Sequence, residues 1–189
     1  MKKRSKRYKK LIEIAKDKNP EKISEIIDLI KKTSTAKFDE SVDVVFKINV
    51  RQSKNEVNLR TVVKLPHGNG KKVRVAVICE DSKSQDAKAS GAELFGSDVL
   101  INEINSGKMN FDKVISTPSM MSKVGKLGKI LGPKGLMPNP KLGTVTNNIK
   151  SAVKLLKSGQ IEIKNDKDGN IGASIGKKSF AREKIDDNF

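Results

Sequence analysis

The sequence predicts an α/β protein of two domains: a discontinuous α+β domain with antiparallel strands, and an inserted, doubly wound α/β domain of Rossmann-like type. Near both ends of the chain, apolar and polar residues alternate, as in half-buried antiparallel strands. In the middle, the strand-like runs are almost continuously apolar, as in parallel strands that helices cover on both faces. We therefore expect the discontinuous domain at residues 1–66 and 159–189, and the inserted domain at residues 67–158.

The chain begins with a strongly basic segment, which is followed by a predicted amphipathic helix. Residues 1–10 hold seven basic residues and no acidic one. Such a segment is a disordered arm, an arm that phosphate groups order, or a solvated tail. Asn19, Pro20 and Glu21 then have the order of a helix cap, a first-turn proline and an acidic first turn. The isoleucines that follow at helical spacing are Ile23, Ile26, Ile27 and Ile30.

Two alternating segments after this helix predict half-buried, antiparallel strands. The apolar residues on one face are Val44, Phe46, Ile48 and Val50 in the first strand, and Val57, Leu59, Val63 and Leu65 in the second. Residues 66–70, Pro-His-Gly-Asn-Gly, then interrupt the alternation. The domain boundary is therefore expected here.

The next strand-like runs are of the buried kind. Residues 73–79 are apolar except for Arg74, and residues 111–115, in which Phe111 precedes Asp112 and Lys113, are expected to be another such strand after a helical stretch near residues 87–94. Runs of this kind with helices between them are typical of a parallel sheet.

Alternation returns toward the end of the sequence. Thr146 is predicted to cap a last clear helix and Gly159 to end it. Residues 161–164 and 171–175 then predict a hairpin. Because the chain passes between the two kinds of strand near Pro66 and again near Gly159, we expect two neighbouring linkers that form a hinge.

The charge of the chain indicates a polyanionic partner. Lys and Arg number 39 against 22 Asp and Glu, so the formal net charge is +17. Membrane binding is disfavoured because no helical segment pairs a basic face with aromatic anchors. Aromatic residues make up only 4% of the chain, with no Trp, which disfavours stacking platforms for single strands. Folded RNA, recognised by its backbone and shape, fits best.

Residues suited to catalysis or metal binding are scarce. The single cysteine, Cys79, and the single histidine, His67, form neither a disulfide nor a zinc site, and we interpret them as a core residue and a loop residue. Residues 166–170 resemble the start of a calcium loop, but Ile171 stands where that loop requires glycine. We expect no catalytic residue, no metal and no cofactor. No apolar run approaches the roughly 18 residues of a membrane span.

The most unusual segment is rich in lysine and glycine. Residues 113–161 contain nine Lys and no acidic residue. Gly128, Gly132 and Gly135 would let the backbone approach a phosphate, to which Lys129 and Lys134 would add charge. We favour a tight helix-to-loop turn instead, because no Gly-Lys pair is followed by the Ser or Thr of a Walker loop. An RNA- or nucleotide-processing enzyme built on this segment is the competing functional class, and turnover of a bound nucleotide would reveal it.

Residues 35–41 join the predicted helix to the first strand. They place Lys37, Phe38, Glu40 and Ser41 together at the boundary between the two elements. Phe38 would stack on an RNA group if it were exposed, whereas isolated aromatic residues are more often buried as core anchors. The composition is compatible with both interpretations.

The glycine-containing segment resembles the signature of a known family. Residues 131–141, Leu-Gly-Pro-Lys-Gly-Leu-Met-Pro-Asn-Pro-Lys, are similar to the signature of the bacterial ribosomal protein L1 family. The signature positions are Gly128, Gly132, Pro133, Lys134, Gly135 and Pro138. The resemblance continues through residues 35–38, 65–68, 73–77, 91–93, 109–112, 143–146 and 165–167.

The resemblance implies a non-enzymatic protein with the same discontinuous and inserted domains. It implies binding to large-subunit rRNA at the mobile stalk beside the E site, assistance in the release of deacylated tRNA, and repression through the protein's own operon mRNA. The implied partners are rRNA, E-site tRNA and that messenger, on ribosomes in the cytoplasm, with no membrane contact and no homo-oligomer. Family members continue beyond the position of Phe189 with a helix and a strand. The implied rRNA-binding residues are Lys37, Phe38, Glu40, Ser41, Glu162, Lys164 and Asn165.

Overall fold

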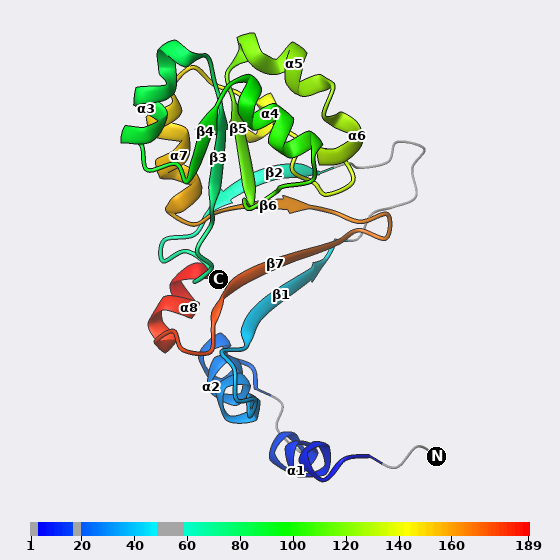
Figure 1. Ribbon diagram of the computed structural model, residues 1–189. Helices are drawn as coiled ribbons and strands as arrows, with labels where there is room; N and C mark the ends of the chain where they lie inside the picture. Colours follow the sequence, from blue (N-terminus) through cyan, green and yellow to red (C-terminus); the bar gives the residue numbers. More distant parts are fainter. Residues whose placement is uncertain (1–3, 17–19, 49–58) are drawn as a thin grey trace.

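The computed structural model describes residues 4–16, 20–48 and 59–189, which form a mixed α/β structure (Figure 1). The α-helices are α1 (Lys6–Ala15), α2 (Ile23–Thr33), α3 (Ser84–Ala89), α4 (Asp98–Asn105), α5 (Met121–Gly125), α6 (Gly128–Leu131), α7 (Ile149–Lys157) and α8 (Arg182–Asn188). The strands are β1 (Ser41–Lys47), β2 (Arg60–Lys64), β3 (Val75–Ile78), β4 (Leu94–Gly96), β5 (Lys113–Ser116), β6 (Gln160–Lys164) and β7 (Asn170–Lys177). The short 3-10 helices are η1 (Asp81–Lys83), η2 (Pro118–Met120) and η3 (Pro140–Leu142).

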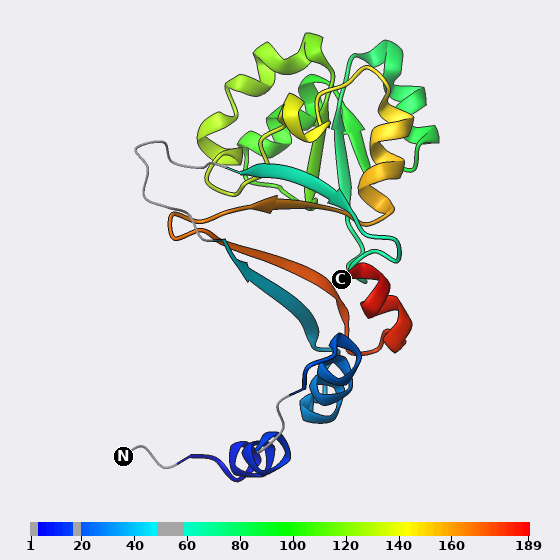
Figure 2. The same cartoon turned by 180° about the vertical axis from the view of Figure 1, so that it is seen from behind.

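The middle of the chain forms a parallel sheet with the strand order β4-β3-β5. Helices lie on both of its faces (Figures 1 and 2), and the central strand β3 is fully buried. Ala76 and Ile78 pack with apolar side chains of α4, α5 and α6. Val75 and Val77 point to the opposite face and pack with side chains of α3 and α7. This two-sided burial explains the continuous apolar runs, and it confirms the predicted parallel strands.

Strand β4 corrects one prediction. A helical stretch was expected near residues 87–94, but α3 ends at Ala89 and Leu94 already begins β4. Gly91 lies between them with a φ of 82°, in the left-handed region that ends helices and that glycine adopts without steric cost. The chain therefore leaves the helix early and returns to the sheet as a short strand.

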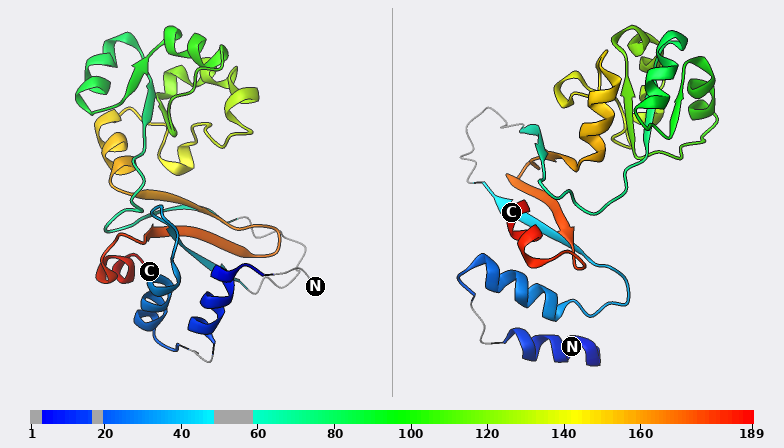
Figure 3. Two further views of the ribbon diagram at one scale, coloured as in Figure 1. Left: turned by 60° about the horizontal axis from the view of Figure 1, so that its bottom comes forward. Right: turned by 90° about the vertical axis from the view of Figure 1, so that its left-hand side faces the viewer.

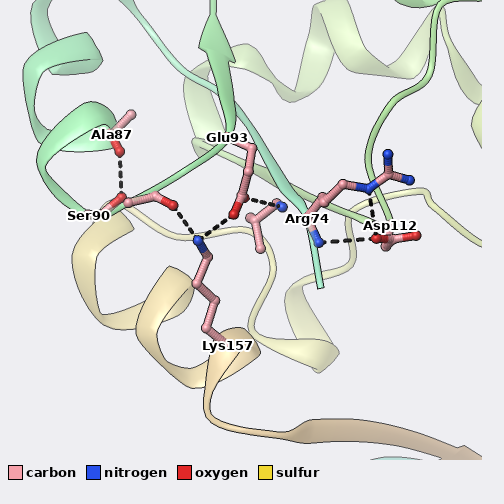
Figure 4. Close-up of polar contacts among 8 residues, drawn as sticks. Arg74, Ala87, Ser90, Glu93, Asp112 and Lys157 are labelled. Carbon is pink, nitrogen blue, oxygen red and sulfur yellow. Dashed lines mark hydrogen bonds and ion pairs between the residues drawn. The ribbon is translucent and has the colours of Figure 1, made fainter. Parts of the chain in front are cut away.

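Polar contacts fix the amino ends of the parallel strands (Figure 4). Glu93, which precedes β4, accepts hydrogen bonds from the backbone N–H of Val75 at 2.7 Å and from Lys157 Nζ at 2.6 Å. Asp112, which precedes β5, accepts hydrogen bonds from the backbone N–H of Arg74 at 3.1 Å and from its Nε at 3.2 Å. These bonds join the starts of all three strands to one another and to the end of α7.

Two antiparallel strand pairs connect the first third of the chain with the last. β1 pairs with β7 along its whole length, and β2 pairs with β6. The predicted hairpin is therefore wrong in its pairing. Among the described residues, one isolated bridge, Asn165 to Ile171, joins the hairpin's two arms, because each arm pairs with a strand from early in the sequence. Val50 and Val57 of the predicted strands lie outside the described residues.

A small core joins the β1–β7 pair to helices from opposite ends of the sequence. Its buried members are Ile27 of α2, Val42 of β1, Ile175 of β7 and Ile185 of α8. Helix α2 begins at Ile23, so Pro20 and Glu21 lie before the helix. Lys22 occupies the cap position without a side-chain hydrogen bond. The predicted start was thus too early, and its proposed cap, Asn19, lies outside the described residues. The burial of Ile27 in this core packs the helix against the β1–β7 pair.

Helix α7 has its predicted end but a different cap. Asn148, not Thr146, is the cap residue, and its side chain accepts a hydrogen bond from the backbone N–H of Ser151 at 3.2 Å. Thr146 Oγ1 accepts a hydrogen bond from the backbone N–H of Asn148 at 3.1 Å, so Thr146 shapes the turn before the helix. Gly159, with a φ of 96°, follows the last turn as predicted.

The two segments that connect the antiparallel pairs with the parallel sheet touch at glycines. A Cβ atom added to Gly159 would stand 2.3 Å from the Cα atom of Gly68. Buried Asn188 of α8 is bound at the same place. Its Nδ2 donates to the carbonyl oxygens of Gly68 at 2.8 Å and Ile175 at 2.7 Å, and its Oδ1 accepts from the backbone N–H of His67 at 3.1 Å. Helix α8 therefore holds residues 67 and 68, where the chain passes from β2 toward the parallel sheet, against β7.

Gly159→Ala is expected to lower the free energy of unfolding by about 2 kcal/mol more than Gly107→Ala does. Both glycines have a left-handed φ, 96° and 87°, so each alanine costs about 1 kcal/mol of backbone strain. The new Cβ would collide with Gly68 in the first variant, whereas nothing lies within 4 Å of it in the second. Urea unfolding of both variants measures the difference. An equal loss of unfolding free energy in the two variants would contradict the close approach of Gly159 to Gly68.

Candidate nucleic-acid interface

Residues 35–41, here called the early loop, lie between α2 and β1 and present two unlike groups to solvent. The side chain of Phe38 is 72% exposed, so it is not a core anchor. Lys37 beside it is also exposed. Neither side chain has an ion-pair, hydrogen-bond or ring partner among the residues that the structure describes. A cation and an aromatic ring are thus both available to a ligand.

The early loop is held in place by hydrogen bonds to the turn after β7. Asp39 Oδ1 accepts from the backbone N–H of Ser179 at 3.0 Å, and Asp39 Oδ2 accepts from Ser179 Oγ at 2.8 Å. The backbone N–H of Lys178 donates to the carbonyl oxygen of Glu40 at 2.9 Å. We call the Asp39–Ser179 contact the clamp. Sequence reasoning missed it because 140 residues separate the partners and no local pattern links them.

Glu40 and Ser41 already have partners within the protein. The Glu40 carboxylate accepts a hydrogen bond from the backbone N–H of Ala36 at 3.3 Å and lies 3.7 Å from Arg7 Nη2. Ser41 Oγ accepts a hydrogen bond from Lys177 Nζ at 2.9 Å. Both residues therefore stabilise the loop and its junction with β1, and each keeps an oxygen that can accept a further bond.

Glu162 lies inside a cluster of charges rather than free at the surface. Its side chain is 19% exposed, and its carboxylate is 2.6 Å from Arg60 Nε and 3.8 Å from Lys113 Nζ. Arg60 belongs to β2 and Lys113 to β5. The Glu162 carboxylate therefore links the antiparallel strands to the parallel sheet.

Lys164 and Asn165 lie at the end of β6. Lys164 is exposed. Asn165 Oδ1 accepts a hydrogen bond from the backbone N–H of Leu59 at 2.6 Å, and its Nδ2 donates to the carbonyl oxygen of Asp166 at 3.0 Å. Asn165 thus orders the strand end, while Lys164 presents its charge to solvent.

The early loop and the turn between β6 and β7 lie at opposite ends of the β1–β7 pair (Figure 2). Ser41 is opposite Lys177, whereas Asn165 bridges to Ile171, which pairs with Phe46. The step from Ser41 to Phe46 along β1 corresponds to roughly 17 Å. The structure therefore does not gather the seven predicted residues at one point.

The family signature forms a helix end in the parallel-sheet part. Gly135 has a φ of 67°. Its backbone N–H donates to the carbonyl oxygen of Gly132 at 2.9 Å, and the N–H of Leu136 donates to that of Leu131 at 3.0 Å. This pair of bonds is the Schellman pattern, in which a left-handed glycine ends a helix. The geometry matches the tight turn that we favoured over a phosphate loop. Of the remaining signature residues, Gly128 is half-buried, Pro133 and Lys134 are exposed, and Pro138 is buried.

Other kinds of site find little support in the described residues. There, no group of three or more His, Cys, Asp or Glu side chains is placed to hold a metal ion. No helix in the described ranges is long and apolar enough to cross a membrane. Burial raises the pKa of the Cys79 thiol, which favours the unreactive protonated form of this core residue.

The clamp should be visible in the titration of Asp39. The pKa of Asp39 lies below its usual value because the Ser179 hydroxyl donates to the ionised carboxylate. A carboxyl group of this kind stabilises the fold above its unfolded-state pKa, and the stabilisation is lost as the pH falls through the folded-state value. We expect Ser179→Ala to raise the pKa of Asp39 in an NMR titration, and Ser106→Ala to leave it unchanged. An unaltered Asp39 titration in Ser179→Ala would contradict the clamp.

Comparisons with known proteins agree with the signature. The model of the ribosomal protein L1p/L10e family matches residues 30–189. The chain is 58% identical over 185 residues to the large ribosomal subunit protein uL1 of Pelagibacter ubique, covering 98% of this chain and 81% of the relative. It is 50% identical over 143 residues to uL1 of Kosmotoga olearia, covering 76% and 62%. These matches span most of the chain, which therefore belongs to the ribosomal protein L1p/L10e family.

Proposed function

We propose that this protein is a non-enzymatic component of the large ribosomal subunit that binds folded rRNA through the early loop. Its family and the name of both relatives, large ribosomal subunit protein uL1, support the ribosomal assignment. The net charge of +17 supports a polyanionic partner. The observation that carries the RNA site is the exposure of Phe38 and Lys37 side by side on a loop that the clamp holds.

The early loop combines the contacts that folded RNA requires. Lys37 would neutralise a phosphate, which contributes affinity without sequence preference. Phe38 would pack on a base or a sugar, and the oxygens of Glu40 and Ser41 would accept bonds from ribose hydroxyls, which fix the register. Because the clamp already orders the loop in the free protein, less conformational entropy is lost on binding.

The late group would contact the same RNA at a second place. Lys164 is its exposed cation, at the far end of the β1–β7 pair. Glu162 and Asn165 would support this contact indirectly, since Glu162 is paired with Arg60 and Asn165 holds the start of β2. Two contacts roughly 17 Å apart suit a folded RNA better than a single phosphate.

We further propose the division into two domains, residues 1–66 with 159–189 and residues 67–158. The discontinuous domain would bind rRNA at the mobile stalk beside the E site, in cytoplasmic ribosomes. The inserted, doubly wound domain would be carried with the stalk as deacylated tRNA leaves. The protein's own operon messenger would compete for the early loop and so repress translation. Displacement of the rRNA by a messenger fragment supports this repression, and simultaneous binding of both RNAs contradicts it.

The rRNA site is tested by salt-dependent binding of the 189-residue chain to an isolated stalk rRNA fragment and to a non-cognate hairpin. Phe38→Ala is expected to weaken cognate binding by about 1–3 kcal/mol, the usual contribution of stacking on an aromatic ring. Lys37→Ala should weaken binding to both RNAs and reduce the salt slope by about 1.

Val99→Ala is the matched control for Phe38→Ala, because Val99 is an apolar side chain that is 73% exposed on α4. It should leave both affinities unchanged. Equal, wholly salt-driven binding of the wild-type chain to both RNAs would refute the early-loop site.

A further inference from the structure

The described part of the basic N-terminal segment leads into the helix α1, which begins at Lys6. Ser5 caps α1 by accepting a hydrogen bond from the backbone N–H of Tyr8 at 3.2 Å. Described residues 4–16 contain one acidic side chain, Glu13, and their basic side chains are exposed. The guanidinium group of Arg4 lies 5.1 Å from the centre of the Tyr8 ring. Residues 6–15 therefore form a helix with exposed basic side chains.

Arg7 attaches this helix to the early loop. Its Nε donates to Thr35 Oγ1 at 2.7 Å, and its Nη2 lies 3.7 Å from Glu40 Oε1. Thr35 and Glu40 stand on either side of Lys37 and Phe38 in the sequence. One guanidinium group thus joins α1 to both ends of the exposed part of the loop.

The contact with Arg7 also changes the electrostatics beside Phe38. Glu40 is the carboxylate of the early loop that the clamp does not use, and uncompensated it would repel a phosphate approaching Lys37. Arg7 places a positive charge 3.7 Å from it. The side chain that anchors the helix therefore also makes the loop more favourable for a polyanion.

The two faces of α1 are divided between protein and solvent. Leu11 and Ile12 are half-buried, and α1 lies beside α2 (Figure 3). With about 3.6 residues per turn, Lys6, Lys9 and Lys10 project from the side opposite these apolar residues. None of the three lysines has an ion-pair partner among the described residues. Three cations without an ion-pair partner in the described ranges therefore lie on the helix that Arg7 joins to the loop.

We propose that α1 and the early loop form one continuous RNA-contact surface, in which Lys6, Lys9 and Lys10 bind phosphates beyond the reach of the loop and Arg7 holds the helix in position. The inference rests on the proposed function and extends its RNA footprint to the N-terminus. RNA suits this surface better than an anionic membrane does, because the apolar face of α1 is turned toward α2 while its lysine face is free.

The first test removes the three lysines together. Lys6→Ala/Lys9→Ala/Lys10→Ala is expected to make the slope of log K against log salt for the stalk rRNA fragment shallower by about 2–3. Affinity at about 0.1 M salt should fall on the order of 10- to 100-fold. The control is Lys88→Ala/Lys108→Ala/Lys154→Ala, which removes equal charge from exposed lysines of the parallel-sheet part. If both triple variants shift the slope equally, the effect is one of net charge and the proposal is wrong.

The second test locates the helix on the RNA. Because Cys79 is buried, a photo-crosslinker can be attached selectively to a cysteine introduced by Lys10→Cys, Lys37→Cys or Lys108→Cys. Probes at positions 10 and 37 should mark adjacent nucleotides. Adding Arg7→Gln should reduce the yield from position 10 more than the yield from position 37, since Arg7 positions the helix whereas the clamp still holds the loop.

The outcomes separate the two proposals. If the wild-type chain prefers the cognate RNA but the probe at position 10 crosslinks no better than the probe at position 108, the α1 surface is refuted and the early-loop site stands. If the wild-type chain shows no cognate preference, the proposed function itself fails. Binding to phosphatidylglycerol vesicles that the α1 triple variant abolishes, with RNA binding unchanged, would assign α1 to a membrane and overturn the inference.

Discussion

The antiparallel pairing of β1 with β7 is the interaction on which the rest of the structure depends. It places Ser41 opposite Lys177, and so brings Asp39 within hydrogen-bonding distance of Ser179. The same register sets Val42 and Ile175 into one core with Ile185 of α8. Asn188 of this helix binds Gly68 and so fixes the segment that connects β2 with the parallel sheet. A shift of the β1–β7 register by one residue would turn the buried side chains of the shifted strand toward solvent, and it would move Asp39 away from Ser179.

Several acidic side chains around the antiparallel strands form contacts within the protein. Glu162 is paired with Arg60 and Lys113, and Glu40 with Arg7. Asp39 accepts bonds from Ser179. Lysines such as Lys37 and Lys164 stay exposed, so a chain of net charge +17 keeps free cations for a polyanion while its internal charges are matched.

Local patterns were sufficient to predict the buried strands β3 and β5, the helix α2 and the end of α7, because burial periodicity and a left-handed glycine act within a few residues. The pairing of β6 and β7 with early strands was not predictable from such patterns, since it depends on partners roughly a hundred residues or more away in the sequence. No local pattern revealed the clamp, whose partners are 140 residues apart, or the contact of Arg7 with Thr35, which are 28 residues apart. Sequence pointed to Phe38, but only the fold determines that the ring is exposed.

We propose that RNA binds at the early loop, which the β1–β7 register holds in place. Hydrogen–deuterium exchange of the full chain, with and without the stalk rRNA fragment and with a non-cognate hairpin as the control, tests it most directly. We expect the cognate fragment to slow exchange selectively in residues 35–41 and in the turn after β7. Protection confined to the glycine-containing segment, residues 128–138, with the early loop unchanged, would contradict it.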